Sequence, residues 1–148
     1  MESPPCTQLL LDNGAEIDIK DINGMTPLHI ACDTGGNECI RMLLSYGADI
    51  NTQNISQMTP LLSAIFNGLS DIVEILYEYE GLNPFLRTKY GYNNLELASS
   101  VPDGYRTLQM IIEWEQKGLP AYPGLDLNSE NEVTLLHTAI NNDALESF

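Results

Sequence analysis

The sequence predicts an all-α fold in which short helix-turn-helix units stack side by side as a solenoid. Two observations predict this. One segment recurs along the chain at a nearly constant interval, and each copy carries the signals of two short helices joined by a turn. Such a helix pair cannot bury its apolar face alone, so successive copies must stack and share one continuous core.

The recurrence is clearest between residues 21–31, which read DINGMTPLHIA, and residues 54–64, which read NISQMTPLLSA, 33 residues further on. A third copy begins at Thr88, 34 residues after the start of the second, and a fourth begins near Ser129. A period in this range is the sequence signature of a repeat architecture.

Each copy carries its own helix signals. Thr26 can cap a helix whose first turn holds Pro27, where a missing N–H costs nothing. The glycines at 35–36 allow a tight turn. A second helix is expected at about 37–46, because its apolar residues recur at helical spacing and Gly47 follows as a terminator.

Two motifs at fixed spacing then point to a family. Residues 26–31 read TPLHIA and residues 47–51 read GADIN, and together they resemble an ankyrin repeat. The resemblance covers nearly the whole chain and is strongest over residues 21–53. It implies an all-α ankyrin repeat solenoid with short β-hairpin tips, and a role in protein–protein interaction.

The resemblance also divides the chain. We expect a single ankyrin repeat domain over residues 1–148. Its parts are a partial repeat at 1–20, repeats at 21–53, 54–87 and 88–128, and a truncated repeat at 129–148. The third repeat carries an inserted loop at about 118–128, which is either a contact element or a tolerated excursion. Because both end copies are incomplete, we expect the chain to be a segment of a longer array or protein.

Composition excludes several kinds of partner. Lys and Arg total 6 against 21 Asp and Glu, a formal net charge of -15, which disfavours nucleic acid and anionic membranes. Without an apolar run of about 18 residues, no membrane insertion is expected. The start lacks the pattern of a secretory signal and the chain has 3 cysteines, so an intracellular location, cytoplasmic or nuclear, is predicted.

Site chemistry is not evident in the sequence. His29 and Cys32 lie three residues apart on one helix, yet both fill packing positions of the repeat. No phosphate-binding loop or metal-ligand spacing stands out. We therefore expect no enzyme activity, no catalytic residues, no metal, no cofactor and no small-molecule substrate.

One modification is worth considering at Asn51. Its context resembles the pattern that asparaginyl hydroxylases modify in ankyrin repeats. The alternative is that Asn51 simply helps to build the turn found in nearly every repeat.

The expected binding surface is concave and is formed by the tips and the exposed side of the first helices; we call it the tip face. The resemblance places thirteen residues on it. They are Ile22, Asn23, Met25, Asp33, Thr34, Ile55, Ser56, Met58, Phe66, Asn67, Lys89, Tyr90 and Tyr92. Exposed apolar residues in a row suggest a protein interface. Alternatively, Ile22, Ile55 and Tyr90 pack on the adjacent tip.

The net charge predicts the kind of partner, because electrostatic attraction steers an acidic protein toward basic protein surfaces. A small basic spot made of Arg87, Lys89 and Arg106 is the second possibility, since it could dock an acidic or phosphorylated segment.

The predicted function is non-catalytic protein–protein recognition through the tip face. The alternative is a targeting or regulatory segment of a larger enzyme or signalling protein whose catalytic domain lies outside this chain.

Overall fold

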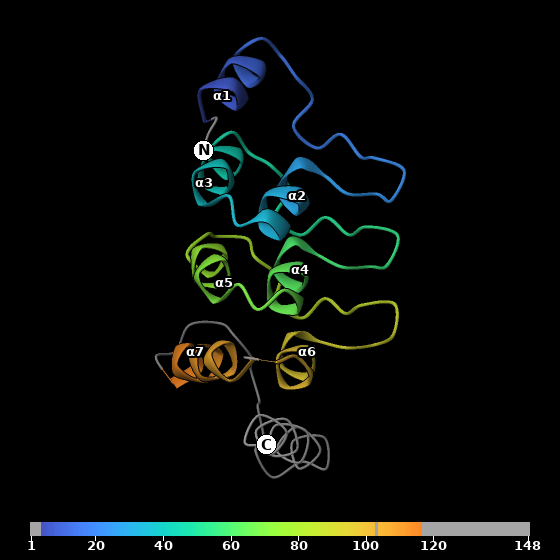
Figure 1. Ribbon diagram of the computed structural model, residues 1–148, viewed down its shortest axis with the longest axis vertical. Helices are drawn as coiled ribbons and strands as arrows, with labels where there is room; N and C mark the ends of the chain where they lie inside the picture. Colours follow the sequence, from blue (N-terminus) through green and yellow to red (C-terminus); the bar gives the residue numbers. More distant parts are fainter. Residues whose placement is uncertain (1–3, 103, 117–148) are drawn as a thin grey trace.

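A computed structural model describes residues 4–102 and 104–116, and its regular elements are seven α-helices. They form two rows that run along the stack (Figure 1). The inner row contains α2 (Pro27–Thr34), α4 (Pro60–Phe66) and α6 (Asn94–Ser100). The outer row contains α1 (Pro4–Asp12), α3 (Asn37–Ser45), α5 (Ser70–Tyr77) and α7 (Gly104–Gln116). The chain is therefore an all-α repeat solenoid, as predicted.

The inner helices begin at side-chain caps. The hydroxyl of Thr26 accepts a hydrogen bond from the N–H of His29, and that of Thr59 accepts one from the N–H of Leu62 at 3.2 Å. In the third copy Asn93 takes over this role. Each cap satisfies a backbone donor that the first helical turn leaves without a partner.

Residue 29 and its counterpart Glu96 complete the cap in the same way although their chemistry differs. The N–H of Thr26 donates to Nδ1 of His29 at 3.2 Å. The N–H of Asn93 donates to Oε2 of Glu96 at 2.8 Å. Replacement of histidine by glutamate in the third repeat therefore preserves a reciprocal capping box.

The apolar core runs without interruption through the stack. Each inner helix packs on the next inner helix and on the outer helix that follows it. Core side chains with at most 1% exposure come from successive copies: Leu28, Cys32, Ile40, Leu61, Leu62, Ala64, Ile65, Val73, Leu76 and Ala98. Full burial of one such leucine or isoleucine stabilises the fold by about 1.5–3 kcal/mol. Neighbouring copies thus supply the burial that a single helix pair lacks.

A buried polar contact fixes the third copy. Asn94 replaces the proline of the two preceding copies and is fully buried. Its Nδ2 donates to the hydroxyl of Tyr77 at 2.7 Å, and its Oδ1 accepts from the N–H of Leu95. The ring of Trp114 lies 4.3 Å from that of Tyr77, centroid to centroid. Residues of α5, α6 and α7 therefore meet around one tyrosine.

Polar links along the outer row join neighbouring units. The hydroxyl of Tyr46 donates to Asp12 at 2.7 Å, and Arg41 pairs with Glu78 at 3.1 Å. In each link the partners lie 34 or 37 residues apart, so it connects adjacent units. Exposed pairs of this kind each contribute about 0–1 kcal/mol.

Three tips project from the same side of the stack, at residues 21–25, 54–58 and 88–92 (Figure 1). In each tip the N–H of the first residue donates to the carbonyl of the fifth. Backbone hydrogen bonds join adjacent tips. The N–H of Ile55 donates to the carbonyl of Asn23, and the N–H of Lys89 donates to the carbonyl of Ser56.

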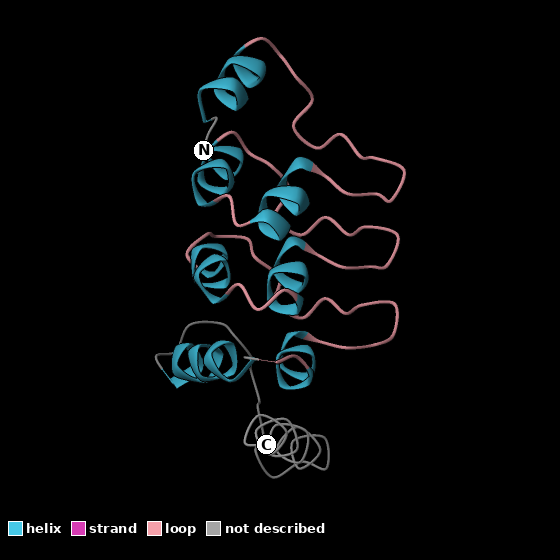
Figure 2. Cartoon of the chain, in the orientation of Figure 1, coloured by secondary structure: helices cyan, strands magenta, loops and turns pink. Residues whose placement is uncertain are grey.

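The structure does not show the short β-hairpins that the family resemblance implies at these tips. The described residues contain no β-strand (Figure 2). Each tip is closed by two backbone hydrogen bonds, because the N–H of the fourth residue also donates to the carbonyl of the first. The predicted loop at about 118–128 and the predicted repeat at 129–148 lie outside the described residues.

Candidate partner-binding surface

The tip face holds several large apolar side chains exposed to solvent. The exposed fraction is 95% for Ile22, 68% for Ile55, 59% for Phe66, 75% for Tyr90 and 46% for Tyr92. They come from three successive tips and from the end of α4. Because the side chains of Ile22, Ile55 and Tyr90 are exposed, the structure does not fit the alternative that they pack on the adjacent tip.

The other predicted residues divide into exposed polar positions and a partly buried floor. The exposed positions are Asn23, Asp33, Thr34, Asn67 and Lys89. The half-buried ones are Met25, Ser56 and Met58. Met58 packs against the core, and the sulfur of Met25 accepts a hydrogen bond from Asn54 Nδ2 at 3.1 Å. Both methionines therefore support the tips from beneath.

A polar cluster joins α2 to α4. Asp33 accepts a hydrogen bond from Asn67 Nδ2 at 3.1 Å and another from the hydroxyl of Ser63. Partial burial raises the pKa of the Asp33 carboxyl, although these hydrogen bonds and the nearby His29 oppose the shift. The carboxylate is thus held in a defined place at the edge of the inner helices.

Ile30 is a surface residue that sequence reasoning missed. Its side chain is 49% exposed, and it precedes Asp33 by three residues on α2. The spacing itself was the available signal, since residues three apart on a helix share a face.

His29 and Cys32 serve the fold. His29 is fully buried, with Nδ1 at the cap and Nε2 donating to the carbonyl of Met58 at 2.9 Å. Burial lowers the pKa of this imidazole and raises the pKa of the Cys32 thiol to about 12. A thiol with so high a pKa is a poor nucleophile at neutral pH. Within 4–102 and 104–116, no three His, Cys, Asp or Glu residues are grouped to hold a metal ion.

The predicted basic spot of three residues is wrong, because the fold separates Arg106 from Arg87 and Lys89. Arg87 pairs with Glu96 at 3.1 Å, and Lys89 lies 5.1 Å from the ring centre of Tyr90. Arg106 belongs to α7 in the outer row, on the opposite side of the stack from the tips (Figure 1). There it pairs with Asp71 of α5 at 3.4 Å.

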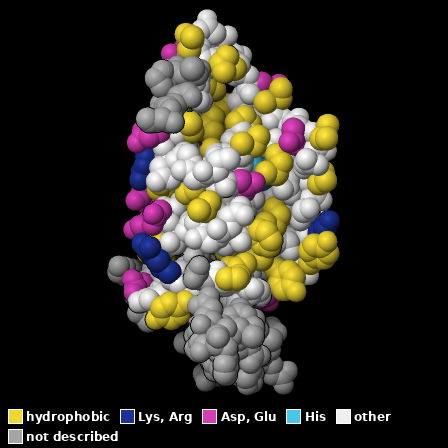
Figure 3. Space-filling view, viewed as in Figure 1, with side chains coloured by type: hydrophobic (Ala, Val, Ile, Leu, Met, Phe, Trp, Pro, Cys, Tyr) yellow, Lys and Arg dark blue, Asp and Glu magenta, His cyan; other side chains and the backbone are white. Residues whose placement is uncertain are grey.

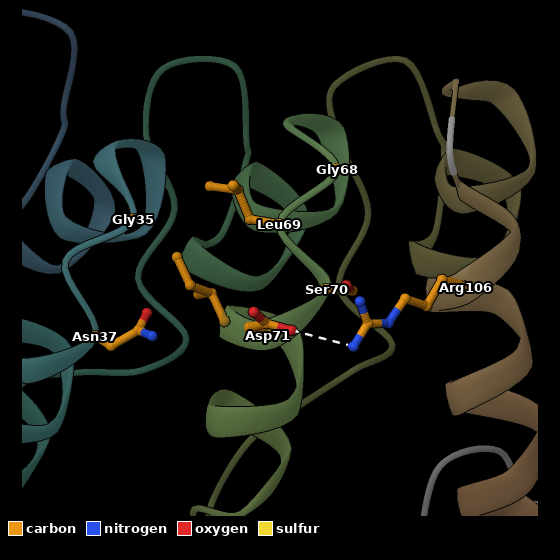
Figure 4. A pocket seen from close by; sticks show the side chains of 8 residues that line it. Gly35, Asn37, Gly68, Leu69, Ser70, Asp71 and Arg106 are labelled. Carbon is orange, nitrogen blue, oxygen red and sulfur yellow. Dashed lines mark hydrogen bonds and ion pairs between the residues drawn. The ribbon is translucent and has the colours of Figure 1, made fainter.

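A groove of about 340 Å³ lies beside that ion pair (Figure 4). It is lined by Gly35, Asn37, residues 68–72 and Arg106. The two titratable side chains that line it, Asp71 and Arg106, are paired with each other. Their side chains are 72% and 70% exposed, so water screens the charges of this pair.

Asn51 joins two loops of adjacent units. Its Nδ2 donates to the carbonyl of Gly81 and its Oδ1 accepts from the N–H of Asn83, both at 2.7 Å. This arrangement supports the interpretation of Asn51 as a turn-building residue.

Charge is distributed unevenly over the face seen in Figure 3. Acidic and basic side chains line the margin of the outer helices, whereas hydrophobic side chains gather over the middle and along the margin of the tips. In the described part of the chain, no helix is both long enough and apolar enough to cross a membrane.

Comparison with known proteins identifies the repeat family. A family model for ankyrin repeats, three copies long, matches residues 2–88, which is more than half of the chain. A search of curated proteins gave no significant match.

Proposed function

Because the chain belongs to the ankyrin repeat family, whose members generally mediate protein–protein interaction, we propose that it binds a partner protein through the tip face. The observation that carries the proposal is the row of exposed apolar side chains in successive tips, from Ile22 through Ile55 to Tyr90. Large apolar residues in water favour association, because burying them yields about 25 cal/mol per Å².

Rigidity supports this assignment. The three tips are linked to one another by backbone hydrogen bonds, and the inner helices beside them are capped. A surface that is already ordered loses less conformational entropy on binding than a flexible loop would. Tyrosine and methionine are also enriched in protein interfaces.

The proposed module is non-catalytic. Its buried histidine and cysteine are used in capping and packing, and the two titratable side chains of the groove, Asp71 and Arg106, are paired with each other. The same face would serve in a regulatory segment of a larger enzyme or signalling protein, since the proposal concerns the face alone.

Affinity capture from a lysate followed by mass spectrometry tests the proposal. Wild type is compared with the double variant Ile55→Arg/Phe66→Arg and with the control Tyr105→Arg. Tyr105 is 68% exposed on α7 in the outer row, so this control carries a similar change away from the tip face. Circular dichroism confirms that the variants remain helical.

We expect a partner that wild type and the control both retain and the double variant loses. A partner bound equally by all three proteins would place binding elsewhere and contradict the proposal.

A further inference from the structure

We propose that the tip face recognises a protein segment bearing a lysine or arginine, whose cationic group pairs with Asp33 while neighbouring apolar atoms pack on Phe66 and Ile30. This inference rests on the proposed function and specifies the chemistry of the partner.

Asp33 is positioned in advance for a cation. Its carboxylate is held by Asn67 and Ser63, two neutral donors from the next unit. Each carboxylate has about four acceptor sites, so these two hydrogen bonds leave room for a further donor. A partner's ammonium or guanidinium group would meet an oriented carboxylate rather than a freely rotating one.

Asp33 lacks a cationic partner of its own in the described chain. No lysine or arginine within residues 4–102 or 104–116 forms an ion pair with it, whereas Glu78, Glu96 and Asp71 each pair with an arginine.

Two exposed apolar residues are neighbours in the chain of Asp33 and of its donor Asn67. Phe66 directly precedes Asn67, the residue that donates to Asp33, and its side chain is 59% exposed. Ile30 lies one helical turn before Asp33 and is 49% exposed. Lysine and arginine carry an apolar stem behind their charge, so a single side chain can satisfy both kinds of contact.

Net charge agrees with this choice of partner. With a formal charge of -15, the chain attracts basic segments and repels acidic ones at long range. Asp33 would convert this general attraction into a specific one, because it lies within the apolar part of the tip face.

Selection of short random peptides displayed on phage tests the inference. The library is selected in parallel on wild type, on Asp33→Asn and on the control Glu74→Gln. Glu74 is exposed on α5, so both variants lose the same charge and only one alters the proposed site. Asparagine has nearly the shape of aspartate and keeps an acceptor for Asn67, so the Asp33→Asn fold should be retained.

On wild type and on Glu74→Gln we expect enrichment of lysine or arginine beside an apolar residue. On Asp33→Asn this enrichment disappears, and peptides selected on wild type bind about tenfold more weakly. Replacing the enriched cation by glutamine in the peptide should weaken binding to wild type by a similar factor. It should leave binding to Asp33→Asn nearly unchanged.

Peptides that bind wild type and Asp33→Asn equally overturn the inference. If these peptides still lose binding to Ile55→Arg/Phe66→Arg, the proposed function survives without it; if they bind that variant too, both fail. Equal weakening by Glu74→Gln would assign the effect to net charge and would likewise overturn the inference.

Discussion

The fourth residue of α3, α5 and α7 is buried in the core, and in α7 this residue is a threonine rather than an apolar residue. Ile40 in α3 and Val73 in α5 are fully buried, and Thr107 in α7 is 1% exposed. The hydroxyl of Thr107 has no hydrogen-bond partner among the described residues. We predict that Thr107→Val increases stability.

The magnitude follows from two contributions. A buried hydroxyl without a partner costs about 1–3 kcal/mol. The methyl group that replaces it adds apolar burial of somewhat under 1 kcal/mol. Threonine and valine have similar helix propensities, so the backbone contribution nearly cancels. The free energy of unfolding should therefore rise by about 2–4 kcal/mol, which corresponds to an increase in Tm of roughly 6–12 °C.

Thr59→Val provides the matched control, because the same chemical change removes a hydrogen bond that exists. The hydroxyl of Thr59 accepts from the N–H of Leu62 at 3.2 Å and caps α4. Loss of such a cap lowers stability by about 1 kcal/mol. Urea unfolding followed by circular dichroism measures both variants. A decrease in the stability of Thr107→Val, or shifts of the same sign in both variants, would refute the reasoning.

Three further predictions concern packing, titration and the links between units. A Cβ at Gly104 would collide with the carbonyl oxygen of Ala98, so Gly104→Ala should cost about 3 kcal/mol. In the control Gly36→Ala the new Cβ would have its nearest neighbour at an ordinary 3.6 Å, so the urea midpoint should change little. Equal losses of stability in Gly104→Ala and Gly36→Ala would contradict the prediction, because the clash at Gly104 would then cost nothing. His29 has a pKa lowered by burial, so its contribution to stability is complete above its ordinary value of 6.5 and is lost as pH falls below it. The decline in unfolding free energy across this range should be shallower in His29→Gln, and an unchanged slope would argue against the assignment. Asn51→Ala removes two hydrogen bonds between units and should lower the free energy of unfolding by about 1–2 kcal/mol, whereas full stability would mean that the loops hold without them.

Much of the fold could be predicted because its signals are local and repeat. Thr26 and Pro27 mark the start of a helix within a few residues of chain, and Gly47 marks an end. Recurrence at 33 residues then implies stacking, since each copy exposes the same apolar face. The predicted second helix of 37–46 differs from the observed one by a single residue.

Contacts between copies were less accessible to sequence reasoning. The sequence did not reveal the capping role of Glu96, because glutamate and histidine differ in charge and shape. Only the structure shows that His29 and Glu96 accept a hydrogen bond from equivalent backbone N–H groups, those of Thr26 and Asn93. The bond from Asn94 to Tyr77 depends on how far two side chains reach between helices, and no period encodes that distance.

The candidate surface shows the same division. The repeat register placed Ile22 and Ile55 at equivalent tip positions, and both are exposed. The grouping of Arg106 with Arg87 failed because closeness in sequence does not reveal that α7 belongs to the outer row. Ile30 was missed because its apolar side chain was assigned to the packed side of α2, although it lies three residues before Asp33, which was expected to be exposed.

The links between Tyr46 and Asp12 and between Arg41 and Glu78 connect nearest neighbours, and this has a mechanical consequence. Under tension from its two ends, a chain held together in this way can detach one unit at a time, since losing an end unit leaves the others in contact. Each detached unit would release about 110 Å of extended polypeptide. The end-to-end distance of the protein would therefore increase in discrete steps, one for each unit that detaches. The tips of the units that remain stacked would keep their spacing.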